Sequence, residues 1–341
     1  MFRRKMYDVL LDWKSRSQGR TAMLVEGARR VGKSTVVEEF ARREYRSYIL
    51  VYFAEASRDV RELFDDVSDL DYLFLQLQLR YSARLFDGES LIIFDEVQMC
   101  PRVRQAVKQL VRDGRYDYIE TGSLVLIHRN TRDILIPSDE ERARMRPMDL
   151  EEFLWARGGD ATVPLLRQAF ASRRPLGERL SRKLMRDFRL YMLVGGMPQA
   201  VDALLRTNDL LAVDDVKRVI VDLYEEDMHK ISLSDKLPVN LGMVYENVVA
   251  QELTAHGRRL FYHTWPKPGT TRNYKIDFIV PDGKKVSPVE VKSSNYRTHA
   301  SPDAFCGKYS SRVGRRYLVY TKDLDRDGAV DCIPTYMSAF L

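Results

Sequence analysis

Eight residues near the start of the chain combine two glycines, a lysine and a hydroxyl group at a spacing suited to binding phosphate. They fill every required position of the pattern Gly-x4-Gly-Lys-Ser/Thr and read Gly27, Ala28, Arg29, Arg30, Val31, Gly32, Lys33 and Ser34. The glycines let successive backbone N–H groups point at a phosphate. Lys33 would contact the β- and γ-phosphates of a nucleotide, and Ser34 would contact Mg²⁺. The pattern therefore predicts a P-loop.

The residues on either side of this loop fit the same interpretation. Residues 22–26 are mostly apolar and suit a buried strand, and residues 35–41 read as a helix. The amino end of such a helix adds partial positive charge beside a phosphate. A glycine-rich turn without a ligand is the alternative, and the flanking strand and helix make it much the weaker one.

A second group of chemically active residues follows four apolar residues, Leu91–Phe94. The run ends in Asp95 and Glu96, as in a Walker B motif. Asp95 would hold Mg²⁺ directly or through water, and Glu96 would polarise the attacking water as a general base. A strand that ends in a surface acid pair is the alternative, but the phosphate loop earlier in the chain favours the Walker B interpretation.

Two hydroxyl residues, Thr121 and Ser123, lie at the end of the next predicted strand. Ligands of open parallel sheets bind at the carboxyl ends of the strands. Either hydroxyl would then sense the γ-phosphate or the attacking water. A simple turn at Gly122 is an equally good interpretation of these residues alone.

Three arginines, Arg142, Arg144 and Arg146, alternate along one later segment. One of them would stabilise charge that develops on the phosphates, in the same chain or on a neighbouring subunit. A solvated strand face is the more usual meaning of such a pattern, and the sequence singles out none of the three.

A separate constellation lies near the carboxyl end of the chain. Asp277 precedes a turn, and Glu290 and Lys292 share one face of the next strand. A hairpin would place Asp277 beside Glu290, and Glu246 on the preceding helix would add a carboxylate. Such a group would hold Mg²⁺ or Mn²⁺ and activate water for phosphodiester cleavage, as in the PD-(D/E)XK nuclease signature. An ordinary charged hairpin is an equally good alternative.

The elements that position these residues alternate between strand and helix in the first half of the chain, which predicts a parallel sheet flanked by helices. The expected strands cover residues 22–25, 48–53, 91–94 and 118–121, with a further one near 142–147. The expected helices include residues 35–43, 70–86 and 102–112. These elements predict an α/β domain over residues 1–148.

The rest of the chain predicts two more regions. A capping-box-like start at Asp149 opens a mostly helical region that extends to about residue 240. Residues 241–341 then read as a smaller α/β domain. Its expected helices cover residues 244–256 and 302–309, and its expected strands lie near residues 260–263, 276–280, 288–292 and 316–321.

The composition is that of a soluble globular protein, with 341 residues, 45% hydrophobic and 30% charged. No apolar run is long enough to span a membrane, so no membrane partner is expected. The net charge of +6 permits binding of nucleic acid without arguing strongly for it. The three cysteines are far apart and lack metal-ligand spacing, which indicates the cytoplasm.

Taken together, these motifs resemble a family of bacterial and archaeal AAA-type ATPases. Its members join a P-loop domain to a C-terminal domain of unknown function with a restriction-endonuclease-like fold. The matching segments are Gly27–Thr35, Ile92–Val97, Thr121–Ser123, Pro147–Leu154, Val194–Pro198, Tyr245–Ala250, Ile276–Phe278 and Glu290–Lys292. The resemblance implies ATP binding by Gly32, Lys33, Ser34 and Thr35, a Walker B site at Asp95 and Glu96, and a sensor at Thr121 or Ser123.

One segment departs from this family. Its members usually carry a longer stretch with a winged-helix-like unit before the last domain, whereas here a short linker, residues 228–240, takes its place. So few residues cannot build a winged helix. We therefore expect no DNA-reading module of that kind, and a lid that departs from the usual geometry.

The sequence thus predicts three parts: a P-loop parallel-sheet ATPase domain, a helical middle region over residues 149–240, and a C-terminal restriction-endonuclease-like α/β domain. The expected function is ATP binding and hydrolysis with Mg²⁺, coupled to a nuclease-like domain that acts on DNA. The alternative is an ATP-dependent switch whose last domain only binds a partner protein or nucleic acid. AAA-type sites often lie between subunits, so the resemblance also implies a homo-oligomer or a partner protein.

Overall fold

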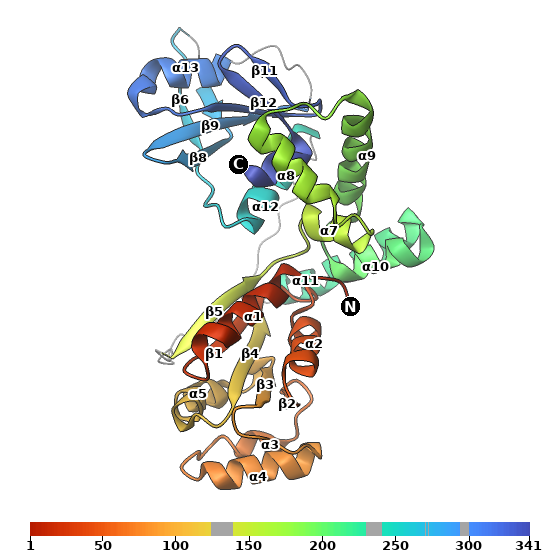
Figure 1. Cartoon of the computed structure of the whole chain (residues 1–341), viewed down its shortest axis with the longest axis vertical. Coiled ribbons are helices and arrows are strands. Elements are labelled where there is room, and N and C mark those ends of the chain that lie inside the picture. The colour runs from red at the N-terminus through yellow and green to blue at the C-terminus, as the bar shows by residue number, and fades with distance from the viewer. Residues whose placement is uncertain (124–138, 230–240, 270, 272, 294–299) are drawn as a thin grey trace. The chain divides into compact units, whose positions relative to one another are not determined.

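The computed structural model describes residues 1–123, 139–229, 241–269, 271, 273–293 and 300–341 (Figure 1). These residues form two compact units. The first unit comprises Met1–Met148 with Met197–Gln199, and the second comprises Asp149–Gly196 with Ala200–Leu341. The domain boundaries expected after residues 148 and 240 stay predictions.

A parallel sheet of five strands forms the centre of the first unit. Its spatial order is β2-β3-β4-β1-β5, and each neighbouring pair is parallel. The strands are β1 Ala22–Gly27, β2 Ser47–Tyr52, β3 Ser90–Asp95, β4 Asp117–Ser123 and β5 Glu140–Met145. The five strands expected from the sequence are all present. Because the sheet is parallel, the ends of β1, β3 and β4 meet at one edge, where the motifs lie.

Helices cover both faces of this sheet. The helices of the first unit are α1 Lys5–Ser17, α2 Lys33–Glu44, α3 Arg58–Glu62, α4 Leu70–Tyr81 and α5 Pro101–Asp113, with a 3₁₀ turn η1 at Val97–Met99. Apolar residues of α1 and α2 pack on one face, and those of α3, α4 and α5 pack on the other. Helix α4 ends earlier than expected because Ser82 adopts a left-handed conformation, with φ 49°.

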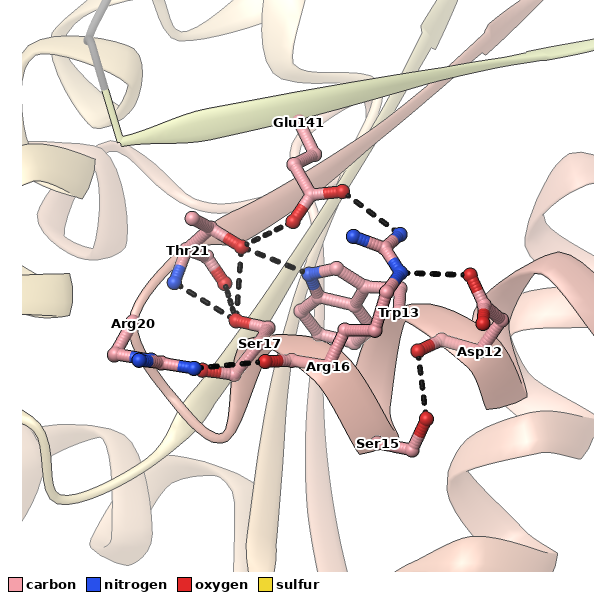
Figure 2. Close-up of polar contacts among 8 residues, drawn as sticks. All are labelled: Asp12, Trp13, Ser15, Arg16, Ser17, Arg20, Thr21 and Glu141. Carbon is pink, nitrogen blue, oxygen red and sulfur yellow. Dashed lines mark hydrogen bonds and ion pairs between the residues drawn. The ribbon is translucent and has the colours of Figure 1, made fainter.

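Helix α1 was not expected from the sequence, and Figure 2 shows how polar contacts hold its carboxyl end against the sheet. The buried indole of Trp13 donates a hydrogen bond to the Thr21 hydroxyl at 3.2 Å. Thr21 in turn lies 2.9 Å from the carboxylate of Glu141 on β5. Arg16 reaches the same carboxylate at 3.1 Å and pairs with Asp12 at 2.8 Å. This chain of contacts joins α1, the residue that precedes β1, and β5.

The second unit begins with helices, as expected. They are α7 Leu150–Ala156, α8 Thr162–Ser172, α9 Glu178–Val194, α10 Pro198–Thr207, α11 Leu210–His229 and α12 Leu241–Ala255, of which α10 begins in the first unit. The Asp149 carboxylate accepts a hydrogen bond from the backbone N–H of Glu152 at 2.9 Å, which caps α7. Most of the expected linker, residues 230–240, lies outside the described residues.

A mixed sheet of five strands, in the order β11-β12-β10-β9-β8, forms the rest of the second unit beside a two-stranded β6-β7 ribbon. The strands are β6 His263–Pro266, β7 Asn273–Ile276, β8 Phe278–Asp282, β9 Lys285–Val291, β10 Arg316–Tyr320, β11 Asp325–Asp327 and β12 Val330–Pro334. Helix α13 Ala300–Tyr309 and the 3₁₀ turns η2 Ser310–Arg312 and η3 Thr335–Phe340 complete the unit.

Two expected strands of this unit need correction. The strand placed near residues 260–263 lies at His263–Pro266, and the one placed at residues 276–280 is two strands, β7 and β8. The chain changes partner at Asp277, because β7 pairs with β6 whereas β8 pairs with β9. A periodicity of two along one apolar run does not reveal such a change of partner.

No helix within the described part of the chain is long and apolar enough to cross a membrane. The three cysteines are buried and none forms a disulfide.

Candidate functional site

The predicted phosphate loop connects the end of β1 to the start of α2, and its backbone has the conformation that the glycines allow. Gly32 lies in the left-handed region at φ 93°, where only glycine is unstrained. Gly27 is needed for a different reason: a Cβ atom there would lie 2.2 Å from the carbonyl oxygen of Met145 on β5. Both glycines of the motif are thus required by the local geometry.

Lys33 opens helix α2 and is buried, with 5% of its surface exposed. Its ammonium group donates hydrogen bonds to the carbonyl oxygens of Gly27 at 3.2 Å and Ala28 at 3.0 Å, within the loop itself. Burial lowers the pKa of Lys33, and the carboxylates of Glu96 and Asp95 oppose that shift. The ammonium is therefore held inside the loop, next to the two acids.

Ser34, Asp95 and Thr121 meet on the α2 face of the sheet. The Ser34 hydroxyl donates a hydrogen bond to Asp95 Oδ1 at 3.0 Å, and the Thr121 hydroxyl donates to the same oxygen. The pairing of β3 with β4 explains this meeting, since Phe94 lies opposite Glu120 and the next residue on each strand is Asp95 and Thr121. A hydroxyl and a carboxylate are hard oxygen donors, the ligands that Mg²⁺ prefers.

Glu96 follows Asp95 in a left-handed conformation, with φ 57°. This turn separates the two acid side chains at the carboxyl end of β3. The amide of Gln98, which is buried, donates a hydrogen bond to the Glu96 carboxylate. Gln98 was not predicted from the sequence, because its position in a 3₁₀ turn carries no recognisable spacing signal.

Ser123 ends β4 and is paired in the sheet with Gly27, the first residue of the phosphate loop. It is therefore placed beside the loop, whereas Thr121 is two residues further back and engaged with Asp95. The sequence left the choice of sensor open, and the two hydroxyls have different surroundings in the structure.

Arg4 is a further residue of the site, and the sequence did not predict it. Its buried guanidinium donates to the carbonyl oxygen of Val31 in the phosphate loop at 2.7 Å, and to that of Arg146 at the same distance. It thereby ties the loop to the segment after β5. No motif marks Arg4, because its role depends on contacts far apart in the sequence.

The three alternating arginines have different surroundings. Arg142 pairs with Glu140 at 2.9 Å, and Arg144 is exposed. Burial lowers the pKa of Arg146, and the positive charge of Arg144 adds to that shift. In the phosphate loop, Arg30 donates to the side chain of Gln199 at 3.1 Å. The part of the chain that the structure describes does not single out one arginine for the phosphates.

The C-terminal constellation is assembled by the β8–β9 hairpin. Phe278 pairs with Val289, which places the preceding residue, Asp277, next to Glu290. The Asp277 carboxylate accepts a hydrogen bond from the backbone N–H of Val291 at 2.9 Å. Lys292 lies 3.1 Å from Glu290. The predicted neighbourhood of Asp277, Glu290 and Lys292 is therefore present.

Lys275 also belongs to this constellation, and the sequence did not single it out. Its ammonium lies 2.7 Å from Glu246 and 2.9 Å from Asp277, so it joins these two carboxylates. Burial lowers the pKa of Lys275, but the hydrogen bonds and charges of the two carboxylates together outweigh burial and raise it. Among the described residues, no three Asp, Glu, His or Cys side chains form a group arranged to hold a metal ion. Metal binding here stays a prediction.

Comparison with known families covers most of the chain in three parts. Residues 19–154 match a family model described as an AAA domain. Residues 241–336 match a domain of unknown function, DUF4143, and residues 185–255 match another, DUF8612. The comparison with curated proteins gives no match. The restriction-endonuclease-like fold of the last part stays a prediction.

Solved structures show only distant likeness. The Aeropyrum pernix Orc1 protein in complex with DNA is 16% identical over 77% of this chain and 75% of its own, with a TM-score of 0.35. Caenorhabditis elegans PCH-2 is 11% identical over 63% of this chain and 65% of its own, with a TM-score of 0.34. Likeness at this level supports no argument about the chain.

The N-terminal match and the geometry of the loop agree. The matched segment contains the parallel sheet, the phosphate loop and the acids at the end of β3. Residues 19–154 therefore match an AAA domain and contain the fold and the motifs of a P-loop domain.

Proposed function

We propose that the first unit binds ATP with Mg²⁺ and hydrolyses it at the loop between β1 and α2. The observation that carries this proposal is the hydrogen bond of 3.0 Å between Ser34 and Asp95. It brings the last residue of the phosphate loop together with the first acid of the Walker B motif. A chance glycine-rich turn would have no reason to meet an acidic strand end from elsewhere in the chain.

Each residue of the site has a part in the reaction. Ser34 and Asp95 would hold Mg²⁺, which neutralises charge on the phosphates when bound. Lys33 and the backbone N–H groups from Gly27 to Thr35 bind the phosphates. Lys33 exchanges its two bonds to loop carbonyls for bonds to phosphate oxygens, and this exchange favours its charged form.

Glu96 is the residue that handles the proton. Its carboxylate accepts a proton from the attacking water while the bond from the β-phosphate bridging oxygen to the γ-phosphorus breaks. The Gln98 amide orients this carboxylate. Ser123, at the end of β4 beside the loop, senses the γ-phosphate.

The test separates binding from chemistry. Glu96→Gln keeps the shape of the side chain and removes the base, so we expect kcat to fall by about 100-fold or more while the Kd for ATP stays within about threefold. Glu89→Gln is the matched control, since Glu89 is exposed on the same unit and pairs with Arg46 at 3.0 Å, away from the loop. Equal kcat in Glu96→Gln and Glu89→Gln would refute the role of Glu96.

A non-catalytic switch is the competing function. In that case ATP would bind tightly with turnover near zero in the unaltered protein, and Glu96→Gln would change neither quantity. The presence of both Asp95 and Glu96 at the end of β3 favours hydrolysis over this alternative.

A second activity, metal-dependent cleavage of phosphodiester bonds by the second unit, is supported by one observation. The β8–β9 pairing places Asp277 beside Glu290, with Lys292 at 3.1 Å from Glu290. A metal ion would have to replace the ammonium of Lys275, which now joins Glu246 and Asp277. Lys275→Met should therefore strengthen Mn²⁺ binding measured by calorimetry, and Glu290→Ala should abolish any cleavage. No Mn²⁺ binding in either the unaltered protein or Lys275→Met would rule this activity out.

A further inference from the structure

Helix α9 carries a stripe of four arginines that no part of the proposed ATPase or nuclease site uses. Arg179, Arg182, Arg186 and Arg189 are spaced three, four and three residues apart, so they lie on one side of the helix. The opposite side is buried through Leu184, Phe188 and other apolar residues. All four arginines are exposed to solvent. The stripe therefore lies on the surface of the second unit, and its four side chains take no part in the packing of α9.

The stripe forms one wall of a groove within the second unit. The groove has a volume of about 1080 Å³, and its other wall is the connection from β10 to β11, residues 320–325. Lys322 lies on that second wall. Five basic side chains and three acidic ones, Glu178, Asp323 and Asp325, line the groove.

The acidic side chains of the groove are already engaged. Asp323 accepts hydrogen bonds from the backbone N–H groups of Leu176 at 3.2 Å and Gly177 at 2.7 Å, and also from that of Leu324. Glu178 pairs with Arg182 at 2.9 Å. These contacts hold both carboxylates against the walls, and the five basic and three acidic side chains leave the lining with a net positive charge.

Three of the four arginines of the stripe have no acidic partner among the described residues. Arg179, Arg186 and Arg189 form no ion pair with any residue that the structure describes. Exposed arginines on other helices of this protein do: Arg206 pairs with Asp202 at 2.5 Å, and Arg218 lies 3.6 Å from Asp215. The other acid on α9, Asp187, pairs with Arg157 at 2.8 Å instead. Unpaired guanidinium groups in a row are suited to phosphate oxygens, which they bind with two parallel hydrogen bonds.

The length of the stripe indicates a polymer. Arg179 and Arg189 are ten residues apart in the sequence, which corresponds to about 15 Å along the helix. One strand of B-form DNA carries about four phosphates over that distance. Tyr320 is the one aromatic residue that lines the groove, and it is buried with its hydroxyl bonded to the Asp323 carbonyl oxygen. The described lining of the groove therefore offers no exposed aromatic ring on which the bases of a single strand could stack.

A second hollow continues the basic surface. It has a volume of about 520 Å³ and is lined by four arginines, Arg173, Arg315, Arg316 and Arg326, with a single acid, Asp331. Strand β11 separates the two hollows, since Asp325 lines the first and its neighbour Arg326 lines the second. The positive charge thus extends past the end of the α9 stripe.

From these observations we infer that the second unit binds the phosphate backbone of double-stranded nucleic acid along the arginine stripe of α9. The binding depends on phosphate contacts and reads no bases, so it is independent of sequence. The site contains none of the residues of the P-loop or of the Asp277 constellation. A protein that does not bind nucleic acid along this stripe would therefore leave the proposed ATPase function intact.

The test is binding of a fluorescent 30-base-pair DNA duplex to the full chain between 50 and 200 mM salt, without nucleotide. Affinity should fall steeply with salt, because counterions are released from the phosphates. The double variant Arg186→Ala with Arg189→Ala should bind at least about tenfold more weakly, and the slope of log K against log salt should be smaller by about two. The control is Arg206→Ala with Arg218→Ala, which removes the same charge from exposed helical sites outside the groove and should stay within about twofold of the unaltered protein.

Two results would overturn the inference. One is equal weakening in the groove variant and its control, which would show that net charge alone attracts the duplex. The other is competition by poly-glutamate as strong as that by unlabelled duplex at equal charge concentration, which would show that the groove takes any polyanion. Unchanged thermal unfolding and unchanged ATP turnover of the groove variant confirm that it is folded.

Discussion

At the scale of single residues, the structure gives the two candidate sensors different tasks. The Thr121 hydroxyl is bound to Asp95, so Thr121→Val should weaken Mg²⁺-dependent ATP binding by roughly tenfold, the value of a hydrogen bond to a charged group. Ser123 stands beside the phosphate loop, so Ser123→Ala should lower kcat by about 100-fold and leave the Kd for ATP unchanged. Fluorescent ATP binding and steady-state turnover measure both. The reverse assignment would follow if Thr121→Val affected kcat alone.

Gly27 offers a second prediction at this scale. A methyl group there would lie 2.2 Å from the Met145 carbonyl oxygen, so the backbone of Gly27→Ala must shift. We expect a loss of more than about 1 kcal/mol in the free energy of unfolding, together with weaker ATP binding. Gly307→Ala is the matched control, because no atom lies within 4 Å of its added Cβ and the residue sits inside helix α13. That control should stabilise the protein by up to about 1 kcal/mol.

The residues that the sequence identified are those whose partners are fixed by a local pattern. Lys33 and Ser34 belong to one loop, and Asp95 ends an apolar run that has to be a strand. The sequence did not predict Arg4 and Gln98, because both act through contacts that form only in the folded protein. Lys275 was not predicted for the same reason, since its position between Glu246 and Asp277 depends on where α12 lies against the strands.

At the scale of elements, a buried charge cluster links α5 to the sheet and gives a prediction about pH. Arg104 of α5 lies 2.5 Å from Glu140 of β5 and 3.7 Å from Glu120 of β4, and all three side chains are almost fully buried. Burial raises the pKa of Glu120 to about 8, and the charge of Glu140 adds to the shift. Glu120 is then protonated in the folded protein at neutral pH, whereas in the unfolded chain it is ionised.

This difference makes the protein less stable as pH rises. The folded state binds one proton more than the unfolded state between about pH 4.5 and pH 8, so the free energy of unfolding falls by up to about 1.4 kcal/mol for each pH unit in that window. Glu120→Gln, which resembles the protonated side chain, removes that dependence. The free energy of unfolding, measured with urea at pH 5 and at pH 8, should rise in Glu120→Gln relative to the unaltered protein as pH rises. A constant difference between the two would contradict the protonated state of Glu120.

The elements of the first unit were predicted more completely than those of the second, and the reason is physical. Strands β1, β2 and β3 contain continuous apolar runs, as expected for strands buried between two layers of helices, and all five strands of the sheet were predicted. In the second unit β11 has three exposed residues and leaves no apolar signal. Strands β7 and β8 lie in two different sheets although only Asp277 separates them, and no local sequence pattern indicates this change of sheet. Helix α1 was not predicted although Leu10 and Trp13 are fully buried, because charged residues such as Asp8 and Lys14 alternate with its few buried apolar ones.

At the scale of the whole molecule, two compact units predict two separate responses to ligand. ATP with Mg²⁺ binds only the first unit in this account and stabilises it by about 2.7 kcal/mol at a concentration 100 times the Kd. Hydrogen exchange of the full chain should therefore show slower exchange in β1, α2 and β3 on addition of ATP with Mg²⁺. Duplex DNA should instead slow exchange in α9. Protection of α9 by ATP alone would contradict the separate sites.

ATP hydrolysis at the loop between β1 and α2 is best tested by measuring phosphate release from ATP and Mg²⁺ by the full chain, beside Lys33→Met. We predict steady release by the unaltered protein and loss of both ATP binding and release in Lys33→Met, because this substitution removes the buried ammonium from the loop. Equal release by the two proteins would contradict the claim, since hydrolysis would then take place somewhere other than the loop between β1 and α2.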